Sequence, residues 1–335
     1  MGILQTVSED KTLLAATVCF GVVGAFFTAV KAFSFFKMIL DVLVVPGISL
    51  SKFGAGKGSW AVITGASDGI GKEFASQLAK KKFNLLLVSR TESKLQALAK
   101  ELEQAHGVQT KTYAMDFTRG NESDYSNLGQ IINTIEVGVL VNNVGTNHDI
   151  PTPFDEESNE TIANIVEVNI NGTLKVSKLV IPQMKARRSG LILNLGSFSG
   201  LVATPYLSVY SAGKAFLSTW SQALGTELAG DGIVVEHINT YFVVSAMSKI
   251  RRPTFMIPMP KPYVASVLAK IGVAGGSSVP FSSTPYLGHA LFAWVIENLA
   301  TTGFVVKQNY AMQKDIRRRA LRKREREAQQ GKKTE

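Results

Sequence analysis

The stretch TGASDGIGKEF, residues 64–74, directly follows the short apolar run WAVIT, residues 60–64. Its glycines, Gly65, Gly69 and Gly71, form the pattern G-x-x-x-G-x-G. Glycines at this spacing allow a tight turn, a close approach of the backbone to a pyrophosphate, and close contact between helix and strand. The N-terminus of the following helix offers free N–H groups and a positive dipole to phosphates. Because the strand, loop and helix that this mechanism needs are all present, the stretch predicts a nucleotide-binding site.

Short apolar runs alternate with amphipathic stretches from residue 60 onward. The predicted strands are 60–64, 84–89, 108–115, 137–141, 190–196 and 233–239, and the predicted helices include 70–82, 92–106 and 208–229. Nearly continuous apolar strands separated by helices are typical of a parallel sheet covered on both faces. The sequence therefore predicts an α/β fold with a Rossmann-type doubly wound parallel sheet. Residues 240–285, rich in Pro, Met, Ser and Gly, break the alternation and are predicted to form an irregular lid.

The end of the second predicted strand bears on the choice of cofactor. An acidic residue there suits the ribose 2′-hydroxyl of NAD, but this chain has Ser89 and Arg90 in LLLVSRT. A guanidinium matches a 2′-phosphate in charge and in bidentate geometry, which favours NADPH. The alternative is that Arg90 is a solvated loop residue and that selectivity is loose.

Polar residues also follow two other predicted strands. Asn142 and Gly145 lie in VLVNNVG, residues 139–145, at the end of a buried strand where ligands of open α/β sheets bind. Buried polar side chains need partners, so Asn142 is expected to tie neighbouring strands together, and Gly145 to let the chain approach the cofactor. Asp116 is a candidate acceptor for the adenine amine or, equally, the cap of a turn.

The segment YSAGK, residues 210–214, places Tyr210 and Lys214 on one helix face. A ketone accepts a hydride only if its oxygen receives a proton or a hydrogen bond as charge develops. A nearby ammonium stabilises a phenolate and lowers its pKa from about 10. Ser197, which follows the apolar run LILNLG, is placed to hydrogen-bond the substrate carbonyl. A purely structural Tyr and Lys is the alternative.

These motifs, together with Asn169 in VNING, resemble the short-chain dehydrogenase/reductase family over about residues 58–250. The resemblance implies catalytic roles for Ser197, Tyr210 and Lys214, with Asn169 holding a water near Lys214. Many members of the family have Pro-Gly and then Thr after the last strand before the lid. This chain has Thr240, Tyr241 and Ser245 there, which puts that turn geometry in doubt. The implied cofactor-binding residues are Gly65, Ser67, Asp68, Gly69, Ile70, Gly71, Arg90, Asp116, Asn143, Gly145, Tyr210, Lys214, Val243 and Ser245.

An apolar segment near the N-terminus predicts a membrane anchor. Residues 12–30 carry no charge, and as a helix they extend about 28 Å, close to the hydrocarbon thickness of a bilayer. The acidic residues Glu9 and Asp10 precede the segment, which favours a retained anchor over a cleaved signal peptide. Lys31 and Lys37 follow it and predict a cytosolic C-terminal side. Residues 32–50 are expected to lie at the membrane interface or against the domain, with a second span as the weaker alternative.

The C-terminal region is apolar at first and then basic. Residues 286–306 are apolar but contain His289 and Glu297, which favours a membrane-dipping or core helix over a span. The basic run at 317–327 suits either an anionic membrane surface or a solvated helix. Residues 314–335 hold ten Lys/Arg and four Asp/Glu, a net of +6 out of +10 for the chain. The basic excess is therefore mostly in the tail, and no nucleic-acid partner is predicted.

The last residues, KKTE, resemble the dilysine retrieval signal of endoplasmic reticulum membrane proteins. Glycosylation sequons begin at Asn121, Asn159 and Asn171 inside the predicted domain, where glycans are expected to disrupt packing, again favouring the cytosol. The chain has one cysteine, Cys19, which suits a reducing compartment. Its four histidines are scattered, so no metal site is predicted.

The flanks and the segments LVSRTESKL and AMSKIRRP narrow the resemblance to the microsomal very-long-chain 3-oxoacyl-CoA reductases. This implies NADPH-dependent reduction of a long-chain 3-oxoacyl-CoA in fatty-acid elongation at the endoplasmic reticulum membrane, with the bilayer and other elongation enzymes as partners. The alternatives are a steroid, retinoid or acyl-dihydroxyacetone phosphate reductase, and an inactive scaffold. The expected divisions are an anchor region (1–57), a catalytic domain (58–250), a lid with an apolar membrane-associated segment (251–306) and a basic cytosolic tail (307–335).

Overall fold

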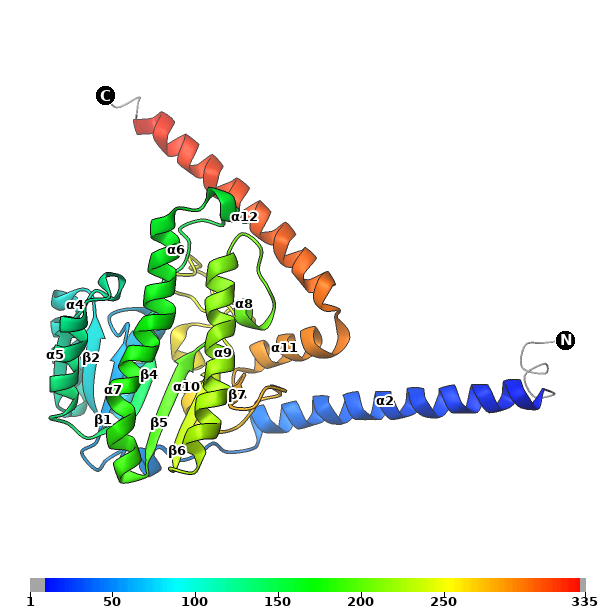
Figure 1. Ribbon diagram of the computed structural model, residues 1–335, viewed down its shortest axis with the longest axis horizontal. Helices are drawn as coiled ribbons and strands as arrows, with labels where there is room; N and C mark the ends of the chain where they lie inside the picture. The colour runs from blue at the N-terminus through cyan, green and yellow to red at the C-terminus, as the bar shows by residue number, and fades with distance from the viewer. Residues whose placement is uncertain (1–9, 332–335) are drawn as a thin grey trace.

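The structure, a computed structural model, describes residues 10–331. Its centre is a seven-stranded sheet in the order β3-β2-β1-β4-β5-β6-β7, with every neighbouring pair parallel (Figure 1). The order reverses direction between β1 and β4, and ligands of open α/β sheets bind beyond the carboxyl ends of the strands at such a point. The strands are β1 (Trp60–Thr64), β2 (Asn84–Ser89), β3 (Thr110–Ala114), β4 (Val137–Asn142), β5 (Gly190–Leu195), β6 (Ile233–Ile238) and β7 (Ser282–Ser283).

Helices cover both faces of this sheet. Residues of α3, α4 and α10 share one hydrophobic core with one face, and residues of α5, α7 and α9 share a second core with the other. The helices of the domain are α3 (Gly69–Lys80), α4 (Glu92–His106), α5 (Glu122–Ile132), α6 (Asn159–Val166), α7 (Gly172–Arg187), α8 (Phe198–Leu201), α9 (Ser208–Ala229) and α10 (Pro260–Ala269). The predicted doubly wound sheet is confirmed.

Side chains along the central strands alternate between the two cores. In β1, Ala61 and Ile63 face the core beneath α3, whereas Trp60 and Val62 face the core beneath α7. Successive side chains of a strand point to opposite faces, so a strand covered on both sides is apolar throughout. This is why the central predicted strands stand out as continuous apolar runs, whereas β3 at the edge of the sheet, TKTYA, is only partly buried. Each of the six is found within a few residues of its expected range.

The expectation of an irregular segment over residues 240–285 is wrong in two places. Residues Pro260–Ala269 form α10, and Tyr263 and Val267 of this helix lie fully buried in the core beneath α3. Pro260 begins this helix, because the fixed φ and the missing N–H of a proline are tolerated in the first turn. Strand β7 has only two residues, too few for an apolar pattern to reveal. Leu50 and Phe53, which precede the expected catalytic domain, belong to the same core. The expected domain divisions stay a prediction.

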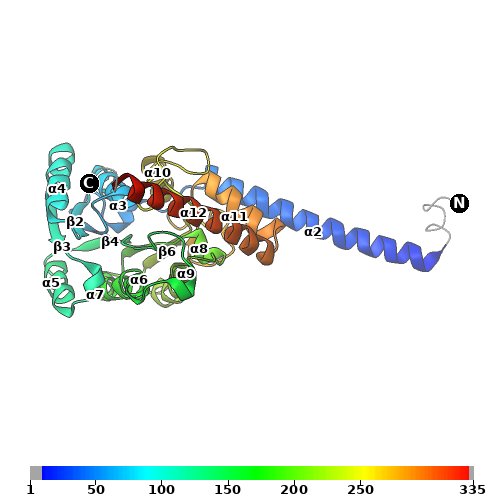
Figure 2. The same cartoon turned by 90° about the horizontal axis from the view of Figure 1, so that it is seen from above.

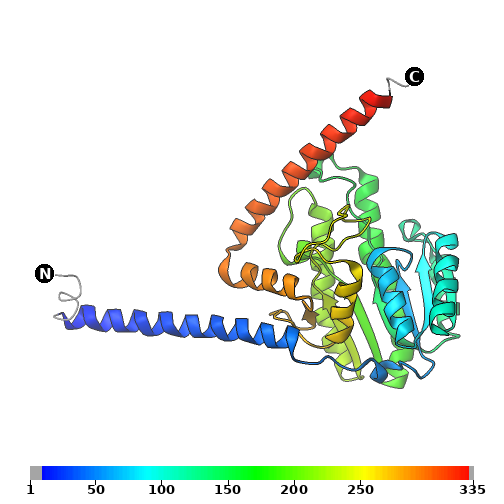
Figure 3. The same ribbon diagram turned by 180° about the vertical axis from the view of Figure 1, so that it is seen from behind.

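Three helices extend beyond this body: α2 (Lys11–Leu43), α11 (Leu287–Leu299) and α12 (Thr302–Gly331). Helix α2 projects away from the domain, and within residues 10–331 it is the one helix long and apolar enough to cross a membrane (Figure 3). Its first turn is capped by Asp10, whose carboxylate accepts from Thr12 N at 2.8 Å. Residues 12–30 of α2 are exposed, which makes it a candidate membrane anchor.

The last third of α2 lies against α11, as Figure 2 shows. Met38 and Val42 are buried against Ala290, and the rings of Phe35 and Trp294 meet edge to face at 5.1 Å. Of the alternatives for residues 32–50, contact with the rest of the protein is therefore the one found here. Helix α11 is in part a packed helix, as the polar groups in its sequence suggested.

Candidate active site

The turn between β1 and α3 has glycine where the backbone favours it or where a side chain does not fit. Gly65 and Gly69 have φ of +67° and +54°, in the left-handed region that favours glycine. A Cβ atom on Gly71 would lie 2.1 Å from the carbonyl oxygen of Gly65. Asn143 at the end of β4 braces the turn, because its Nδ2 donates to Thr64 O at 3.0 Å and to Gly65 O at 3.2 Å. The loop thus forms a cradle at the N-terminus of α3 that matches a pyrophosphate.

The segment after β6 reaches the same loop. The Cβ atom of Ser245 lies 3.4 Å from where a side chain on Gly69 would begin, and Met247 Cε lies 3.9 Å from the equivalent point on Gly145. Val243, just before, is buried in the core beneath α3. The structure therefore brings Ser245 beside the glycine loop although Pro-Gly is missing from this turn. Asp68 caps α3 by accepting from Gly69 N at 2.7 Å, and Ser67 and Ile70 lie in the same turn.

The ends of β2 and β3 carry the residues expected to select and hold the rest of the cofactor. The buried Ser89 hydroxyl has no hydrogen-bond partner in the described part of the chain, and the exposed Arg90 guanidinium makes no ion pair there. An exposed guanidinium without an ion pair fits a phosphate. Asp116 caps the short turn Phe117–Arg119 by accepting from Thr118 N at 3.1 Å, so the capping alternative is realised. Its contact with adenine stays a prediction.

Ser197, Tyr210 and Lys214 gather at the end of β5. Ser197 follows the strand, and its Oγ accepts from Ser199 N at 3.1 Å to cap α8. Tyr210 and Lys214 lie on α9 and are both buried. Lys214 Nζ donates to Leu195 O at 2.6 Å and lies 5.7 Å from the centroid of the Tyr210 ring.

Burial dominates the electrostatics of this set. It raises the pKa of Tyr210, and the hydrogen bond with Ser197 lowers that pKa in part. Burial also lowers the pKa of Lys214 to about 8. The expected lowering of the Tyr210 pKa by Lys214 is not found in this arrangement, because the ammonium is directed to the carbonyl of Leu195. The side chain that lowers the pKa of Tyr210 here, against the larger effect of burial, is Ser197.

Asn169 lies in a π-helical turn, Glu167–Asn171, between α6 and α7. Both ends of its side-chain amide bind the backbone of Thr146: Oδ1 accepts from Thr146 N at 2.8 Å, and Nδ2 donates to Thr146 O at 2.9 Å. Asn169 therefore holds the chain just after Gly145, a role that sequence reasoning missed. Such π-bulges occur frequently at functional sites. The water-holding role of Asn169 stays a prediction.

Further polar residues support the site from beneath. Asn142 Nδ2 donates to Ser177 Oγ at 2.9 Å and to Asn194 Oδ1 at 2.8 Å, which confirms that Asn142 ties β4 to β5. Asn194 in turn donates to Ser221 on α9 at 2.9 Å. Asn194 was missed, although an asparagine inside the apolar run LILNLG was a visible signal. The network fixes the helix that carries Tyr210 relative to the sheet.

His237 was also missed. Its Nε2 lies 2.1 Å from where a Cβ atom on Gly196 would be, directly beneath the turn that presents Ser197. Burial lowers the pKa of His237 to about 3, with a smaller contribution from Lys214, so the imidazole is neutral at physiological pH. Its neighbours come from β5, β6 and β7, and no local sequence pattern predicts that meeting.

The glycine cradle, the polar set at the ends of β4 and β5, and the Tyr–Lys pair on α9 occur together in one known family. The model of that family, short chain dehydrogenase, matches residues 59–254. This chain belongs to the short-chain dehydrogenase family.

Known members similar to this chain cover most of its length. A very-long-chain 3-oxoacyl-CoA reductase of Aspergillus oryzae is 51% identical over 327 residues, which is 96% of this chain and 92% of the relative. A reductase of the same name from Pyricularia oryzae is 50% identical over 309 residues, 91% of this chain and 93% of the relative. Among solved structures, a short-chain dehydrogenase from Sphingobium yanoikuyae in complex with NADPH is 26% identical with a TM-score of 0.60 and covers 68% of this chain and 88% of that one.

Proposed function

We propose that this short-chain dehydrogenase uses NADPH to reduce a very-long-chain 3-oxoacyl-CoA to the 3-hydroxyacyl-CoA. The observation that carries this proposal is the meeting of Ser197, Tyr210 and Lys214 at the same carboxyl edge of the sheet as the glycine cradle, in a chain about half identical to reductases of that name over nearly its whole length.

The cofactor is held by residues that the fold places at the carboxyl ends of the strands. The backbone of the cradle and the N-terminus of α3 would hold the pyrophosphate, and Arg90 would hold the 2′-phosphate. Ser245 and Val243 would bound the nicotinamide end, and Lys214 would bind the nicotinamide ribose. When bound, NADPH supplies the hydride that is added to C3 of the substrate.

The protein's own residues handle the proton. Ser197 donates a hydrogen bond to the 3-oxo oxygen and polarises the carbonyl. Tyr210 gives its phenolic proton to that oxygen as charge develops, so the oxygen stays on C3 as the hydroxyl group of the product and the tyrosine becomes a phenolate. The Lys214 ammonium stabilises that phenolate, and a water at Asn169 returns the proton from solvent. In this assignment Lys214 leaves the Leu195 carbonyl when it turns to the ribose and the phenolate.

The substrate assignment is tested with the full-length protein in detergent. NADPH consumption is measured with 3-oxoacyl-CoAs of increasing chain length, and 3- and 17-ketosteroids serve as competing substrates. We expect turnover of the long acyl-CoAs to exceed steroid turnover. Steroid turnover far above acyl-CoA turnover would contradict the proposal and leave only the reductase chemistry.

The same proposal places the protein in the endoplasmic reticulum membrane, with the domain and the C-terminus in the cytosol. Its support is the exposed apolar part of α2, the lysines Lys31 and Lys37 after it, and KKTE, which lies outside the described residues. Other enzymes of fatty-acid elongation are the proposed partners. Protease protection of sealed microsomes is the test, because a cytosolic domain is digested without detergent.

The sequons support this orientation less than expected. Asn121 and Asn159 are exposed at the starts of α5 and α6, where a glycan does not disturb the core. Only Asn171 is partly buried, with its Nδ2 donating to Glu167 Oε2 at 2.5 Å. A glycosylation test therefore reports on orientation directly: unmodified Asn121 and Asn159 are expected, and their modification would place the domain in the lumen.

A further inference from the structure

Helix α12 begins 92 residues after Tyr210 and yet runs back along the loops that border the catalytic set. Figure 1 shows it passing α8 and α6 on its way from the end of α11. Two loops meet it. One, residues 202–207, leads directly into α9 and Tyr210; the other, residues 143–158, follows the strand that ends in Asn142 and includes Gly145.

The loop before α9 contacts the first half of α12. Asn309 Nδ2 donates to Ala203 O at 3.3 Å, and the rings of Tyr310 and Tyr206 lie 5.5 Å apart at an angle of 31°. Tyr206 has φ of +67°, a conformation that a bulky residue adopts only when its surroundings hold it there. Its carbonyl also accepts from Thr152 N at 2.9 Å, so the two loops are joined to each other.

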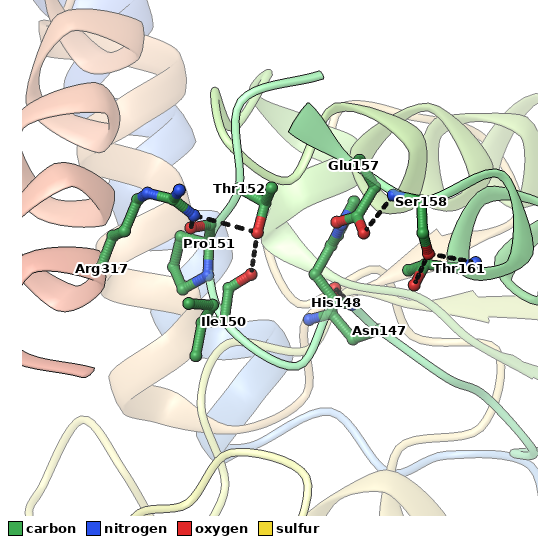
Figure 4. A network of polar contacts seen from close by, with 9 residues as sticks. All are labelled: Asn147, His148, Ile150, Pro151, Thr152, Glu157, Ser158, Thr161 and Arg317. Atoms are coloured by element: carbon green, nitrogen blue, oxygen red, sulfur yellow. Dashed lines mark hydrogen bonds and ion pairs between the residues drawn. The ribbon is translucent and has the colours of Figure 1, made fainter. Parts of the chain in front are cut away.

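The second loop is held by Arg317, as Figure 4 shows. The Nη1 atom donates to Pro151 O at 3.0 Å and to Thr152 Oγ1 at 3.2 Å, and Nη2 pairs with the Glu156 carboxylate. The Arg317 side chain is only 19% exposed, and a guanidinium with two donor groups fixes both the distance and the orientation of its partners. On the inner side of this loop, the buried His148 ring binds Glu157.

A third contact lies further along α12 and is weaker. Arg324 pairs with Asp149, which also accepts from Lys249 Nζ at 2.8 Å in the segment after β6. These side chains are mostly exposed, so their pairing contributes little to stability. Among the residues that the structure describes, the neighbouring arginine of the helix, Arg318, pairs only with Asp315 of α12 itself and is 63% exposed. Arg317 is thus the cationic side chain of α12 that is both partly buried and bound to a loop of the site.

We propose that Arg317 is a positioning residue for the substrate: it holds residues 151–156 against α12 and so sets the wall beside which the acyl part of the substrate lies. The inference rests on the proposed function, because it assigns the loop to the acyl chain. Arg317 contacts neither the glycine cradle nor Ser197, Tyr210 or Lys214. Its loss therefore weakens substrate binding and leaves NADPH binding and the chemical step intact.

The experiment compares Arg317→Gln with Arg318→Gln in the full-length protein. The two changes remove one positive charge at adjacent positions of the same helix, so they form a matched pair. For Arg317→Gln we expect KM for a long-chain 3-oxoacyl-CoA to rise about tenfold, the scale of losing one charge-assisted, partly buried contact, with kcat and the Kd of NADPH within about twofold. For Arg318→Gln we expect all three values to match the wild type.

Exchanging the two charges distinguishes loss of the ion pair from misfolding of the variant. The double variant Arg317→Glu, Glu156→Arg restores the ion pair with its direction reversed, and we expect it to recover part of the KM that Arg317→Glu alone loses. Equal behaviour of Arg317→Gln and Arg318→Gln would overturn the proposal. So would a rise in the Kd of NADPH as large as the rise in KM, because that result indicates a general structural role.

A readout without substrate separates this inference from the proposed function. Hydrogen–deuterium exchange of residues 146–158 is expected to speed up in Arg317→Gln and not in Arg318→Gln. If the wild type fails to reduce 3-oxoacyl-CoAs while this exchange difference is present, the substrate assignment fails and the role of Arg317 in holding the loop stands. If exchange is the same in both variants, the role of Arg317 fails whatever the substrate.

Discussion

Polar groups are buried at the carboxyl edge of the sheet but partly exposed in the outer helices α2, α11 and α12. At the edge, Asn142, Asn194 and Lys214 are buried, and their bonds join neighbouring strands or the helix packed on them. In the outer helices, contacts such as Arg317–Glu156 join residues 161 positions apart and are partly open to water. In the proposed function the edge supplies the chemistry in a rigid setting, and the outer helices position the loops beside it.

The largest effect is expected at the edge, from Tyr210→Phe. Removing the phenolic proton removes the general acid, and kcat is expected to fall by roughly 10³-fold with NADPH binding unchanged. NADPH consumption measures the rate. Tyr113→Phe is the control, because its hydroxyl donates to Asp124 O at 3.0 Å far from the catalytic set. Full activity of Tyr210→Phe would break the assignment of chemistry to this edge.

The glycine cradle is expected to be nearly as sensitive. Gly71→Ala places a Cβ atom 2.1 Å from the Gly65 carbonyl, so the backbone must shift, and we expect NADPH affinity to fall by roughly 10²-fold, together with a lower melting temperature. Fluorescence titration with NADPH measures the first effect. Gly230→Ala meets no atom within 4 Å and has an ordinary backbone, so it is expected to behave like the wild type. Similar losses in both variants would mean that crowding at the cradle is not the cause.

Arg90→Gln sharpens the cofactor assignment. If the exposed guanidinium binds the 2′-phosphate, its loss lowers the preference for NADPH over NADH by about tenfold, with little change in kcat for NADH. The ratio of kcat/KM for the two cofactors is the measurement. Lys100→Gln removes an exposed charge from α4 and is expected to leave the ratio unchanged. An unchanged ratio in Arg90→Gln would favour loose selectivity, the alternative drawn from the sequence.

The smallest effect concerns stability and pH. Glu236 on β6 is buried, and burial raises its pKa from 4.5 to about 7, although Gly272 N and Ser283 Oγ donate to it. Between these pH values the unfolded chain releases the proton while the folded chain keeps it, so raising the pH favours unfolding through this group. The difference in melting temperature between wild type and Glu236→Gln is expected to shift by a few degrees from pH 4.5 to 7. A pH-independent difference would contradict the raised pKa.

Local patterns explain why most of the edge was predictable. Gly65, Ser197 and Tyr210 lie within short motifs whose strand, loop and helix are contiguous in the chain, so sequence spacing carries their geometry. The two-residue strand β7 and the packing of His237 depend on segments brought together from far apart, and no local periodicity reports them. The direction of Lys214 toward Leu195 is likewise a tertiary feature, which is why its expected effect on Tyr210 is not found.

The outer helices were predictable only as helices. The apolar length of α2 and the basic composition of α12 are visible in the sequence, but the partners of these helices are not. Arg317 stands in a run of three arginines, and nothing in that run distinguishes it from Arg318. Only the fold shows that one of them lies against Pro151 and the other against its own helix.

Two hydrogen bonds just after the apolar part of α2 bear on the orientation of the domain relative to a membrane. Lys31 Nζ donates to Asn298 Oδ1 at 2.8 Å, and Trp294 Nε1 donates to Ser34 Oγ at 3.1 Å. Because α11 binds α2 at two successive turns, these contacts oppose rotation of α2 about its own axis. If α2 lies in a bilayer, the angle fixed by these contacts sets the tilt of the domain relative to the membrane.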